Sequence, residues 1–396
     1  MKTRLYIKIL SFFKNKLFRV IDNIIDTVCR FNNSAKFKAD ILLIRVDAIG
    51  DFILWQDSLR AYHKKYVGQK VILLCNNLVY DIALLDNFFF DIWSIDKSKF
   101  NRSPMYRYQL VKKIKSYYFK EVISPVYSRD YYFSDRLVYL TLSDNKIGYN
   151  GNLSNIKKQH KKKSDKWYTR LVDYNEKDSS ELLINANFVK CVCDSNFVPH
   201  LPVFFFDTKD YHFIYEKYCV FSISASYAPR AWNATNFSIV ANKIPLDYQI
   251  VLLGKGNVDR KKGDEFIANI SNKERIHNLI DKTSIVETIK IVSRATFVIG
   301  NDSSVVHIAG AVRVPSICLA SGAHYKRFMP YPAQIPEYFY HPRTVVHKMD
   351  CFGCDYRCIY PIIGQLECIK GVEVSEVILK LHQLLDELKE NEYDRK

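Results

Sequence analysis

Apolar residues in the first half of the chain occur as short continuous runs that alternate with stretches of helical spacing. Residues 41–46 (ILLIRV) form the first run, and its branched, apolar side chains are typical of a buried parallel strand. A polar loop at residues 47–51 is followed by helical spacing over residues 52–66 and by another apolar run at residues 71–75. A further strand is expected at residues 121–125. This alternation predicts a doubly wound α/β domain.

The second half of the chain repeats the pattern. Apolar runs at residues 218–223, 248–254, 295–300 and 314–319 predict four more strands, and polar turns lie between these runs and the helical stretches that follow. A long terminal helix is expected at residues 373–390, where the apolar residues share one stripe. A second α/β domain therefore follows the first.

Two domains account for most of the 396 residues. We place the first at residues 39–205 and the second at residues 206–396, because residues 199–210 look like an inter-domain connection. The predicted fold class is α/β, with two doubly wound Rossmann-like domains facing a central cleft. Ligands of such sheets bind outside the carboxyl ends of the strands, which is where the polar turns lie.

Residues 1–38 precede the first domain and carry a different pattern. Apolar residues recur at spacings of three and four, which predicts a basic amphipathic leader helix. Lys14 and Lys16 argue against a signal peptide, and no run reaches the roughly 18–20 apolar residues that a membrane span needs. The helix either lies on an anionic membrane surface or packs on the protein itself. The apolar residues of its stripe are Leu10, Phe13, Leu17, Val20, Ile24, Val28 and Phe31.

The net charge of the chain indicates which kinds of molecule it could bind. The chain carries 58 Lys and Arg against 42 Asp and Glu, a formal net charge of +16, which favours nucleic acid, anionic lipid or phosphorylated substrates. No nucleic-acid-binding motif is visible, and no Gly-x-Gly-x-x-Gly follows a strand, which argues against a dehydrogenase. Residues 150–167 are polar and lysine-rich, and we expect an exposed loop there, as a binding surface or simply a solvated segment. Its clustered lysines are Lys157, Lys158, Lys161, Lys162 and Lys163.

The ten cysteines do not resemble the disulfide framework of a small secreted domain, so we expect a reducing compartment. Four of them cluster near the end of the chain as Cys351-x2-Cys354-x3-Cys358-x9-Cys368. Four thiols at this spacing could hold a structural zinc ion, form disulfides or stay reduced, and the sequence leaves these alternatives open.

The loop after the first predicted strand holds a candidate catalytic carboxylate. Gly50 permits a tight turn from strand to helix, and Asp51 falls at the helix N-terminus. There the carboxylate can cap free backbone N–H groups, or it can act as a general base at a strand end that faces the cleft.

The second domain offers a candidate anion site. Residues 299–307 (IGNDSSVVH) pass from a strand through small polar residues into a helix, whose first N–H groups and dipole favour an anion. His307 lies one turn into this helix, within reach of the same ligand or in the core. Arg230 follows another strand and suits a diphosphate, although it could be an ordinary surface residue. Facing Asp51, these groups predict transfer of a sugar from a nucleotide donor without a metal ion.

Several segments resemble, in order and spacing, the motifs of glycosyltransferase family 9, the bacterial heptosyltransferases that build lipopolysaccharide core. Residues 41–51 (ILLIRVDAIGD) resemble the opening motif, and residues 302–311 (DSSVVHIAGA) followed by Val314-Pro315 resemble the second signature. Residues 278–284 (NLIDKTS) stand at the usual place before that signature, and residues 230–232 (RAW) match a basic-x-Trp segment.

The resemblance implies an inverting transferase of the GT-B fold. The first domain would bind the acceptor and the second the nucleotide sugar, with Asp51 as the base that deprotonates the acceptor hydroxyl. Asp259 would be the acidic ribose contact. The donor-binding residues implied are Arg230, Gly254, Asp259, Asp302, Ser303, Ser304 and His307. The acceptor-binding residues implied are Gly50, Lys157, Lys158, Lys161 and Lys162.

The partners implied are a nucleotide sugar, ADP-heptose or a related donor, a lipid-linked glycan acceptor and an anionic membrane surface. No cofactor and no metal are expected, and nucleic acid is not an expected partner. The protein would be cytoplasmic and peripheral on the inner face of the bacterial inner membrane. Ser304 stands where the family usually has glycine, so a left-handed or closely packed position now carries a side chain. The alternatives are a catalytically inactive GT-B scaffold and a basic nucleic-acid-binding protein.

Overall fold

The computed structural model describes Ile25, Thr27 and residues 35–176, 180–208 and 215–393. The leader helix expected within the first 38 residues falls almost wholly outside this part. Ile25 is helical and packs into the core of the first sheet. In the part of the chain that is described, no helix is both long and apolar enough to cross a membrane.

Two compact units make up the described chain, and each contains one sheet of six parallel strands. This confirms the α/β class with two doubly wound sheets, whereas the domain boundaries at residues 39 and 206 stay predictions. The first unit holds the chain up to Asp47, Tyr66–Tyr80 and Asn87–Tyr174. The second unit holds Ala48–Lys65, Asp81–Asp86 and the chain from Asn175 onward.

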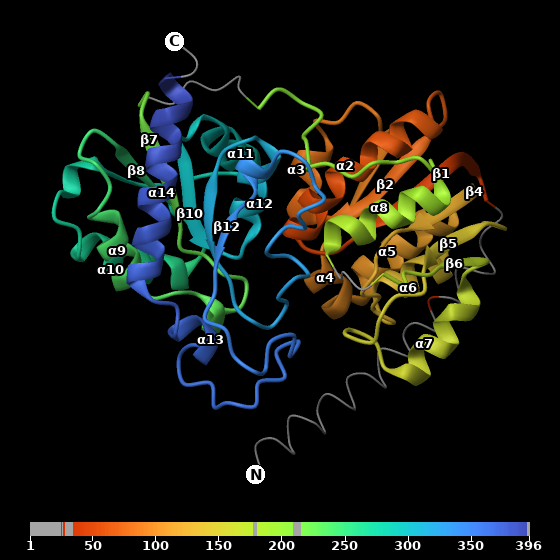
Figure 1. Ribbon diagram of the computed structural model, residues 1–396. Helices are drawn as coiled ribbons and strands as arrows, with labels where there is room; N and C mark the ends of the chain where they lie inside the picture. Colours follow the sequence, from red (N-terminus) through yellow and green to blue (C-terminus); the bar gives the residue numbers. More distant parts are fainter. Residues whose placement is uncertain (1–24, 26, 28–34, 177–179, 209–214, 394–396) are drawn as a thin grey trace. The chain divides into compact units, whose positions relative to one another are not determined.

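The sheet of the first unit has the strand order β3-β2-β1-β4-β5-β6 (Figure 1). Leu42, Leu43 and Ile44 of its central strand are all fully buried, as a parallel strand covered on both faces requires. The apolar runs predicted for this half are therefore central strands. The strands are β1 (Phe37–Arg45), β2 (Val71–Asn76), β3 (Asp91–Ile95), β4 (Tyr117–Ser124), β5 (Lys146–Tyr149) and β6 (Arg170–Val172).

On this sheet, helix α5 packs against β4, and helix α6 packs against β1 and β4. Helix α5 begins at Pro104, where the missing N–H costs nothing and the Ser103 side chain accepts a hydrogen bond from the Tyr106 N–H. The helices of this unit are α4 (Lys97–Arg102), α5 (Pro104–Lys115), α6 (Ser134–Leu140) and α7 (Lys158–Ser164), and α3 (Tyr80–Ala83) begins at its boundary.

The prediction of a loop at residues 150–167 was wrong for its second half, which is helical in α7 and the 3-10 turn Asp165–Trp167. Lysine is a good helix former, and the Lys161 ammonium pairs with the Asp165 carboxylate one turn later, 3.0 Å from its Oδ2 atom. Trp167 packs on Tyr139 with ring centroids 4.8 Å apart, which anchors the end of the helix.

The sheet of the second unit has the order β12-β11-β10-β7-β8-β9, and its strands are also parallel throughout. The four strands predicted from the sequence are β7, β8, β10 and β11, and the short strands β9 and β12 were not foreseen. The strands are β7 (Tyr218–Ser222), β8 (Gln249–Leu253), β9 (Ile276–Asn278), β10 (Phe297–Asn301), β11 (Ser316–Leu319) and β12 (Arg343–Val345).

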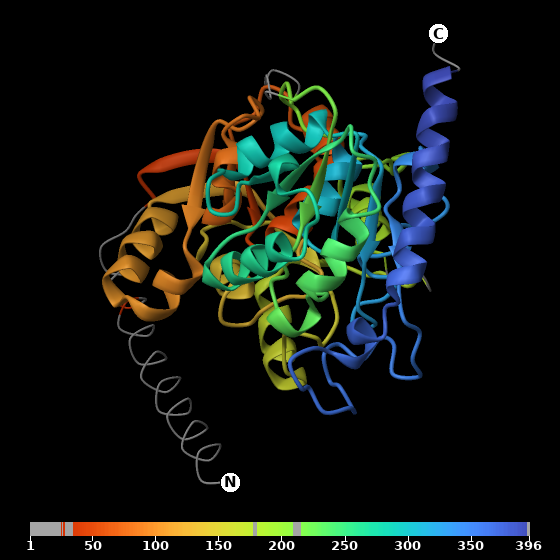
Figure 2. The same ribbon diagram turned by 90° about the vertical axis from the view of Figure 1, so that its left-hand side faces the viewer.

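The predicted terminal helix is confirmed as α14, which stands on the outside of the second unit and packs against β11, β12 and α9 (Figures 1 and 2). The helices of this unit are α2 (Ile49–Lys65), α8 (Glu181–Val192), α9 (Ala234–Ala241), α10 (Asn257–Ala268), α11 (Ile285–Arg294), α12 (Ser304–Ala311), α13 (Glu367–Lys370) and α14 (Val374–Tyr393). Short 3-10 helices of this unit lie at Ala228–Arg230, Lys273–Arg275 and Tyr338–Tyr340, and another lies at Asn77–Val79 in the first unit.

Helices α2 and α8 belong by their contacts to the second unit, although both precede residue 206 in the chain. Most of α2 is buried, and it packs on α8 and α12. The Asn185 side chain of α8 donates a hydrogen bond of 3.4 Å to the Leu54 carbonyl of α2. Gly50 and Asp51 therefore lie in the first turn of a helix packed beside α12, not in the loop expected at residues 47–51.

The core of the second unit predicts unequal costs for two leucines of α14. Leu381 is fully buried in this core, whereas Leu379 is 56% exposed. We expect Leu381→Ala to lower the free energy of unfolding by about 2–5 kcal/mol and Leu379→Ala to lower it by less than about 0.5 kcal/mol. Denaturant unfolding of both variants measures this, and equal losses would contradict the packing of α14 described above.

Candidate active site

The strand order of the second sheet reverses between β7 and β10. From β7 the chain adds β8 and β9 on one side and then returns to place β10, β11 and β12 on the other. The loops that follow β7 and β10 therefore diverge at the carboxyl edge of the sheet, where doubly wound sheets bind their ligands. The predicted residues Arg230, Asp302, Ser303 and His307 all follow one of these two strands.

A buried amide joins the two loops. The Asn301 side chain donates to the Ile223 carbonyl at 3.0 Å and accepts from the Trp232 N–H at 2.8 Å. Asn301 is fully buried, so its amide replaces the water that these backbone groups would otherwise need. Asn301 follows the strand expected at residues 295–300 and is the last residue of β10, and the sequence alone does not show that its side chain joins the two loops.

Arg230 reaches across this edge to the start of α12. One guanidinium nitrogen donates to the Asp302 carbonyl, and the other donates to the Tyr356 hydroxyl at 2.7 Å. Burial disfavours the charge, but Asp302 and Tyr356 more than offset this, so the pKa of Arg230 is raised above its ordinary value. The buried Nε atom has no hydrogen-bond partner among the described residues. The charged Arg230 side chain can therefore still donate a hydrogen bond from Nε to a ligand.

The N-terminus of α12 lacks a side-chain cap. Ser303 has the extended backbone of an N-cap residue, yet its hydroxyl accepts no hydrogen bond from the helix. The Ser303 Oγ atom is itself buried and has no partner in the described structure. A helix N-terminus with free N–H groups, a free hydroxyl and Arg230 nearby suits an anion such as a diphosphate.

Ser304 is the first residue of α12. Among the described non-glycine residues with positive φ, Ser304 does not occur, so no left-handed backbone is required there. The serine therefore introduces a hydroxyl at the anion site and no backbone strain.

His307 is buried one turn into α12, as its spacing predicted. Its Nδ1 atom lies 2.9 Å from the Tyr331 hydroxyl, and its Nε2 atom lies 3.8 Å from the Asp302 carboxylate. Burial lowers the pKa of His307 to about 4 despite the opposing charge of Asp302. The imidazole is therefore neutral near pH 7.

The candidate base approaches the same helix. A Cβ atom on Gly50 would stand 3.3 Å from Cδ2 of His307, which shows how closely the first turn of α2 meets α12. Asp51 follows Gly50 directly in that turn. The structure thus brings the loop with the predicted base and the helix with the predicted anion site together in one unit.

Gly254 and Asp259 lie at the next strand end, after β8. The Asp259 carboxylate is buried and accepts hydrogen bonds from the Ser224 hydroxyl and, at 2.9 Å, from the Lys255 N–H. Ser224 also accepts a 3.3 Å hydrogen bond at its carbonyl from Asn301. Asp259 is therefore linked to the anion site through Ser224, and its predicted ribose contact stays a prediction.

The predicted acceptor lysines lie on or next to α7 in the first unit. Lys157, Lys158 and Lys162 are exposed. Lys161 is half-buried, and its ammonium is engaged by Asn150 and Asp165. Three of the four lysines thus have side chains that a ligand could reach, whereas Lys161 supports the helix.

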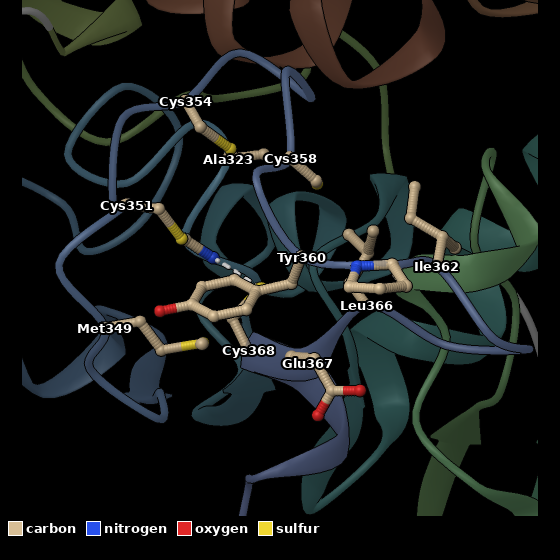
Figure 3. A pocket seen from close by; sticks show the side chains of 12 residues that line it. Ala323, Met349, Cys351, Cys354, Cys358, Tyr360, Ile362, Leu366, Glu367 and Cys368 are labelled. Atoms are coloured by element: carbon tan, nitrogen blue, oxygen red, sulfur yellow. Dashed lines mark hydrogen bonds between the residues drawn. The ribbon is translucent and has the colours of Figure 1, made fainter.

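The four clustered cysteines line one small cavity of about 20 Å³, together with Tyr360 (Figure 3). All four are free thiols, and Cys368 accepts a weak 3.4 Å hydrogen bond from the Gly322 N–H. No three His, Cys, Asp or Glu side chains in the described structure are grouped so that they could hold a metal ion. The cavity is bounded by residues 351–358, the segment that carries Tyr356 to Arg230.

The family model of glycosyltransferase family 9 (heptosyltransferase) matches residues 144–341, half of the chain. The chain belongs to this family. A search of the curated proteins finds no match. Membership makes the protein a glycosyltransferase and confirms both the resemblance stated from the motifs and the enzyme class.

Several solved structures have a fold similar to that of this chain. A family 9 glycosyltransferase of Veillonella parvula is 15% identical with a TM-score of 0.66, covering 90% of this chain and 99% of its own. E. coli ADP-heptose LPS heptosyltransferase II is 14% identical with a TM-score of 0.58, covering 89% and 99%. TibC of enterotoxigenic E. coli, a dodecameric iron-containing heptosyltransferase in complex with ADP-D-β-D-heptose, is 13% identical with a TM-score of 0.51, covering 90% and 79%.

These likenesses confirm the GT-B type of fold for the family 9 chain. Iron is named for TibC, whereas the cysteines of this chain are not arranged as ligands of one ion in the described structure.

The buried imidazole predicts a pH effect on stability. An unfolded histidine has a pKa of about 6.5, so between pH 6.5 and about 4 the unfolded chain binds a proton that folded His307 does not. The contribution of His307 to stability therefore falls as the pH drops through this window, by at most about 3 kcal/mol. His307→Asn removes the titrating group and should flatten this part of the dependence.

Urea unfolding at pH 7 and pH 5 compares wild type with His307→Asn, and His382→Asn on α14 is the control because His382 is exposed. The control should keep the wild-type dependence. An unchanged dependence in His307→Asn would show that the buried imidazole titrates as it does in the unfolded chain.

Proposed function

We propose that this glycosyltransferase transfers a heptosyl group, with inversion, from ADP-heptose to a lipid-linked glycan such as lipopolysaccharide core. The observation that carries the proposal is the anion site after β7 and β10. There Arg230 keeps a buried N–H and Ser303 a buried hydroxyl that have no partner among the described residues, and the N-terminus of α12 has no side-chain cap. ADP-heptose is the donor named for E. coli heptosyltransferase II.

The leaving diphosphate carries the charge that develops during transfer. Arg230 is a permanent cation beside Asp302, and the dipole of α12 adds positive potential at its N-terminus. Fixed groups of this kind stabilise developing negative charge without reorganising during the reaction. These groups can take the place of a metal ion, so we propose a metal-independent transfer without any cofactor.

Asp51 is the proposed general base. Inversion requires the acceptor hydroxyl to lose its proton as it attacks the sugar from the face opposite the leaving group. Asp51 lies beside Gly50, which meets His307 of the helix that binds the proposed leaving group. Base and diphosphate site are thus held on helices that pack together.

An anionic acceptor suits the charge of the chain. The exposed Lys157, Lys158 and Lys162 of the first unit offer ammonium groups to acceptor phosphates or acidic sugars. A net charge of +16 also favours residence on the anionic inner face of the bacterial inner membrane, where a lipid-linked acceptor is presented to cytoplasmic enzymes.

The donor site predicts the effect of one arginine on nucleotide affinity. Removing the Arg230 guanidinium deletes a charge-assisted contact of about 1.5–3 kcal/mol, so Arg230→Ala should weaken ADP binding by about tenfold to about a hundredfold. Isothermal titration calorimetry with ADP, GDP and UDP measures this. Arg294→Ala is the control, because Arg294 is exposed and precedes the amino end of β10, opposite the site.

Equal ADP affinity in Arg230→Ala and wild type would remove Arg230 from the donor site. Tighter binding of GDP or UDP than of ADP would keep the transferase and overturn the heptose assignment. Failure of the wild type to bind any of the three would contradict the donor site as a whole.

The proposed base predicts a loss of turnover without a loss of donor affinity. Asp51→Asn keeps the shape of the side chain but cannot accept the proton, so kcat should fall by about 10²–10⁴-fold. The assay follows ADP release from ADP-heptose with a lipopolysaccharide-core acceptor, and it includes excess EDTA because no metal is expected to take part.

Glu376→Gln is the control, since Glu376 is also an acid in the first turn of a helix, α14. Full turnover by Asp51→Asn would refute the role of Asp51 as the base. Absence of turnover in both the wild type and Asp51→Asn would favour the inactive-scaffold alternative. Loss of wild-type turnover on adding EDTA would refute metal independence.

A further inference from the structure

The imidazole of His307 is enclosed by groups from three separate segments. Gly50 of α2 borders its Cδ2 atom, and Asp302 lies before α12 with its carboxylate 3.8 Å from Nε2. Tyr331, which belongs to no helix or strand, contacts the other ring nitrogen at 2.9 Å. The Nε2 atom of the ring therefore faces a carboxylate, and the Nδ1 atom faces a phenol hydroxyl.

Tyr331 is held firmly enough to orient this ring. It is 6% exposed, and its ring plane is inclined by only 10° to that of His307, with centroids 5.9 Å apart. A Cβ atom on Gly310 would stand 3.4 Å from Cε2 of Tyr331, so the phenol ring lies against α12 one turn beyond His307. His341 packs edge-on to the same ring, 5.7 Å away.

The proton on the neutral imidazole has one favoured position in this setting. The negative charge of Asp302 favours an N–H at Nε2, the nitrogen that faces it. Nδ1 is then a pure acceptor, and the Tyr331 hydroxyl can donate to it. The opposite tautomer would place the Nε2 lone pair toward the carboxylate, which is unfavourable.

We propose that Tyr331 is a positioning residue, whose hydroxyl donates to Nδ1 of His307 and fixes the tautomer with its N–H on Nε2. This N–H then lies beside Asp302 and the N-terminus of α12, ready to donate to the leaving diphosphate. The part of the proposal that concerns the diphosphate rests on the proposed function. The tautomer itself does not.

The phenol matters because a histidine ring can turn over about its χ2 torsion. A half-turn about χ2 exchanges Nδ1 with Cδ2 and Nε2 with Cε1. Without the hydroxyl, the ring could therefore turn a carbon toward Asp302, or carry its proton on Nδ1. A fraction of the molecules would then present no N–H to the anion site. Removal of the hydroxyl should therefore lower turnover more than it lowers stability.

The first measurement is the tautomer in the ligand-free protein. Histidine is labelled with ¹⁵N, the His307 signals are assigned by their loss in His307→Asn, and the two nitrogens are compared near pH 7. We expect the wild type to carry its proton on Nε2, and Tyr331→Phe to show a mixture of tautomers. Tyr338→Phe is the control, because Tyr338 is 75% exposed in the same unit.

The second measurement is transfer from ADP-heptose. Tyr331→Phe keeps the buried ring, so the fold should persist, and kcat should fall by about tenfold while KM for the donor changes by less than about twofold. Gly310→Ala, which adds a van der Waals contact to the ring and leaves the hydroxyl in place, should keep kcat near the wild-type value.

The outcomes separate the two proposals. A wild-type proton on Nδ1 would overturn the positioning role, whatever the enzyme does. A pure Nε2–H tautomer that persists in Tyr331→Phe, or full turnover by that variant, would also overturn it and leave the proposed function intact. A wild type with the expected tautomer, lost in Tyr331→Phe, but with no transfer from ADP-heptose would support the role of Tyr331 and refute the heptosyl assignment.

Discussion

The buried amide of Asn301 is the contact on which the geometry of the second unit depends. Parallel strands that reverse their order leave two loops diverging at the carboxyl edge, and nothing in the sheet itself joins them. Asn301 does so by bonding to Ile223 and Trp232 on the β7 side while standing at the end of β10. Arg230 lies between these two anchors, so its reach to Asp302 follows from them. The anion site therefore depends on the way in which Asn301 holds the two loops together.

At the carboxyl edge of the second sheet, Arg230 is charged whereas His307 is neutral. His307 is neutral because burial outweighs the attraction of Asp302, whereas Arg230 stays charged because Asp302 and Tyr356 outweigh burial. A neutral imidazole can donate a hydrogen bond without adding a second positive charge beside Arg230. Asp302 thus interacts with both residues. Its carbonyl accepts a hydrogen bond from Arg230, and its carboxylate lies near Nε2 of His307.

The sequence predicted the central strands, the start of α12 and the place of Asp51, because these depend on local periodicity and on strand ends. It failed at α7, where a lysine run was read as a loop although Lys161 and Asp165 stabilise a helical turn. Tyr331 and Tyr356 were also missed. Both come from irregular segments far along the chain, and no short-range pattern shows that they reach His307 and Arg230.

The position of α2 gives the catalytic proposal its physical basis. A base and a leaving-group site act together only if their spacing is fixed to within a fraction of an ångström. Gly50 allows α2 to touch His307 directly, since any larger residue would press on the ring. The spacing between Asp51 and the anion site is therefore set by helix packing inside one unit. Because Tyr331 contacts His307 from the opposite side, a residue outside any helix also bears on the position of the ring between α2 and α12.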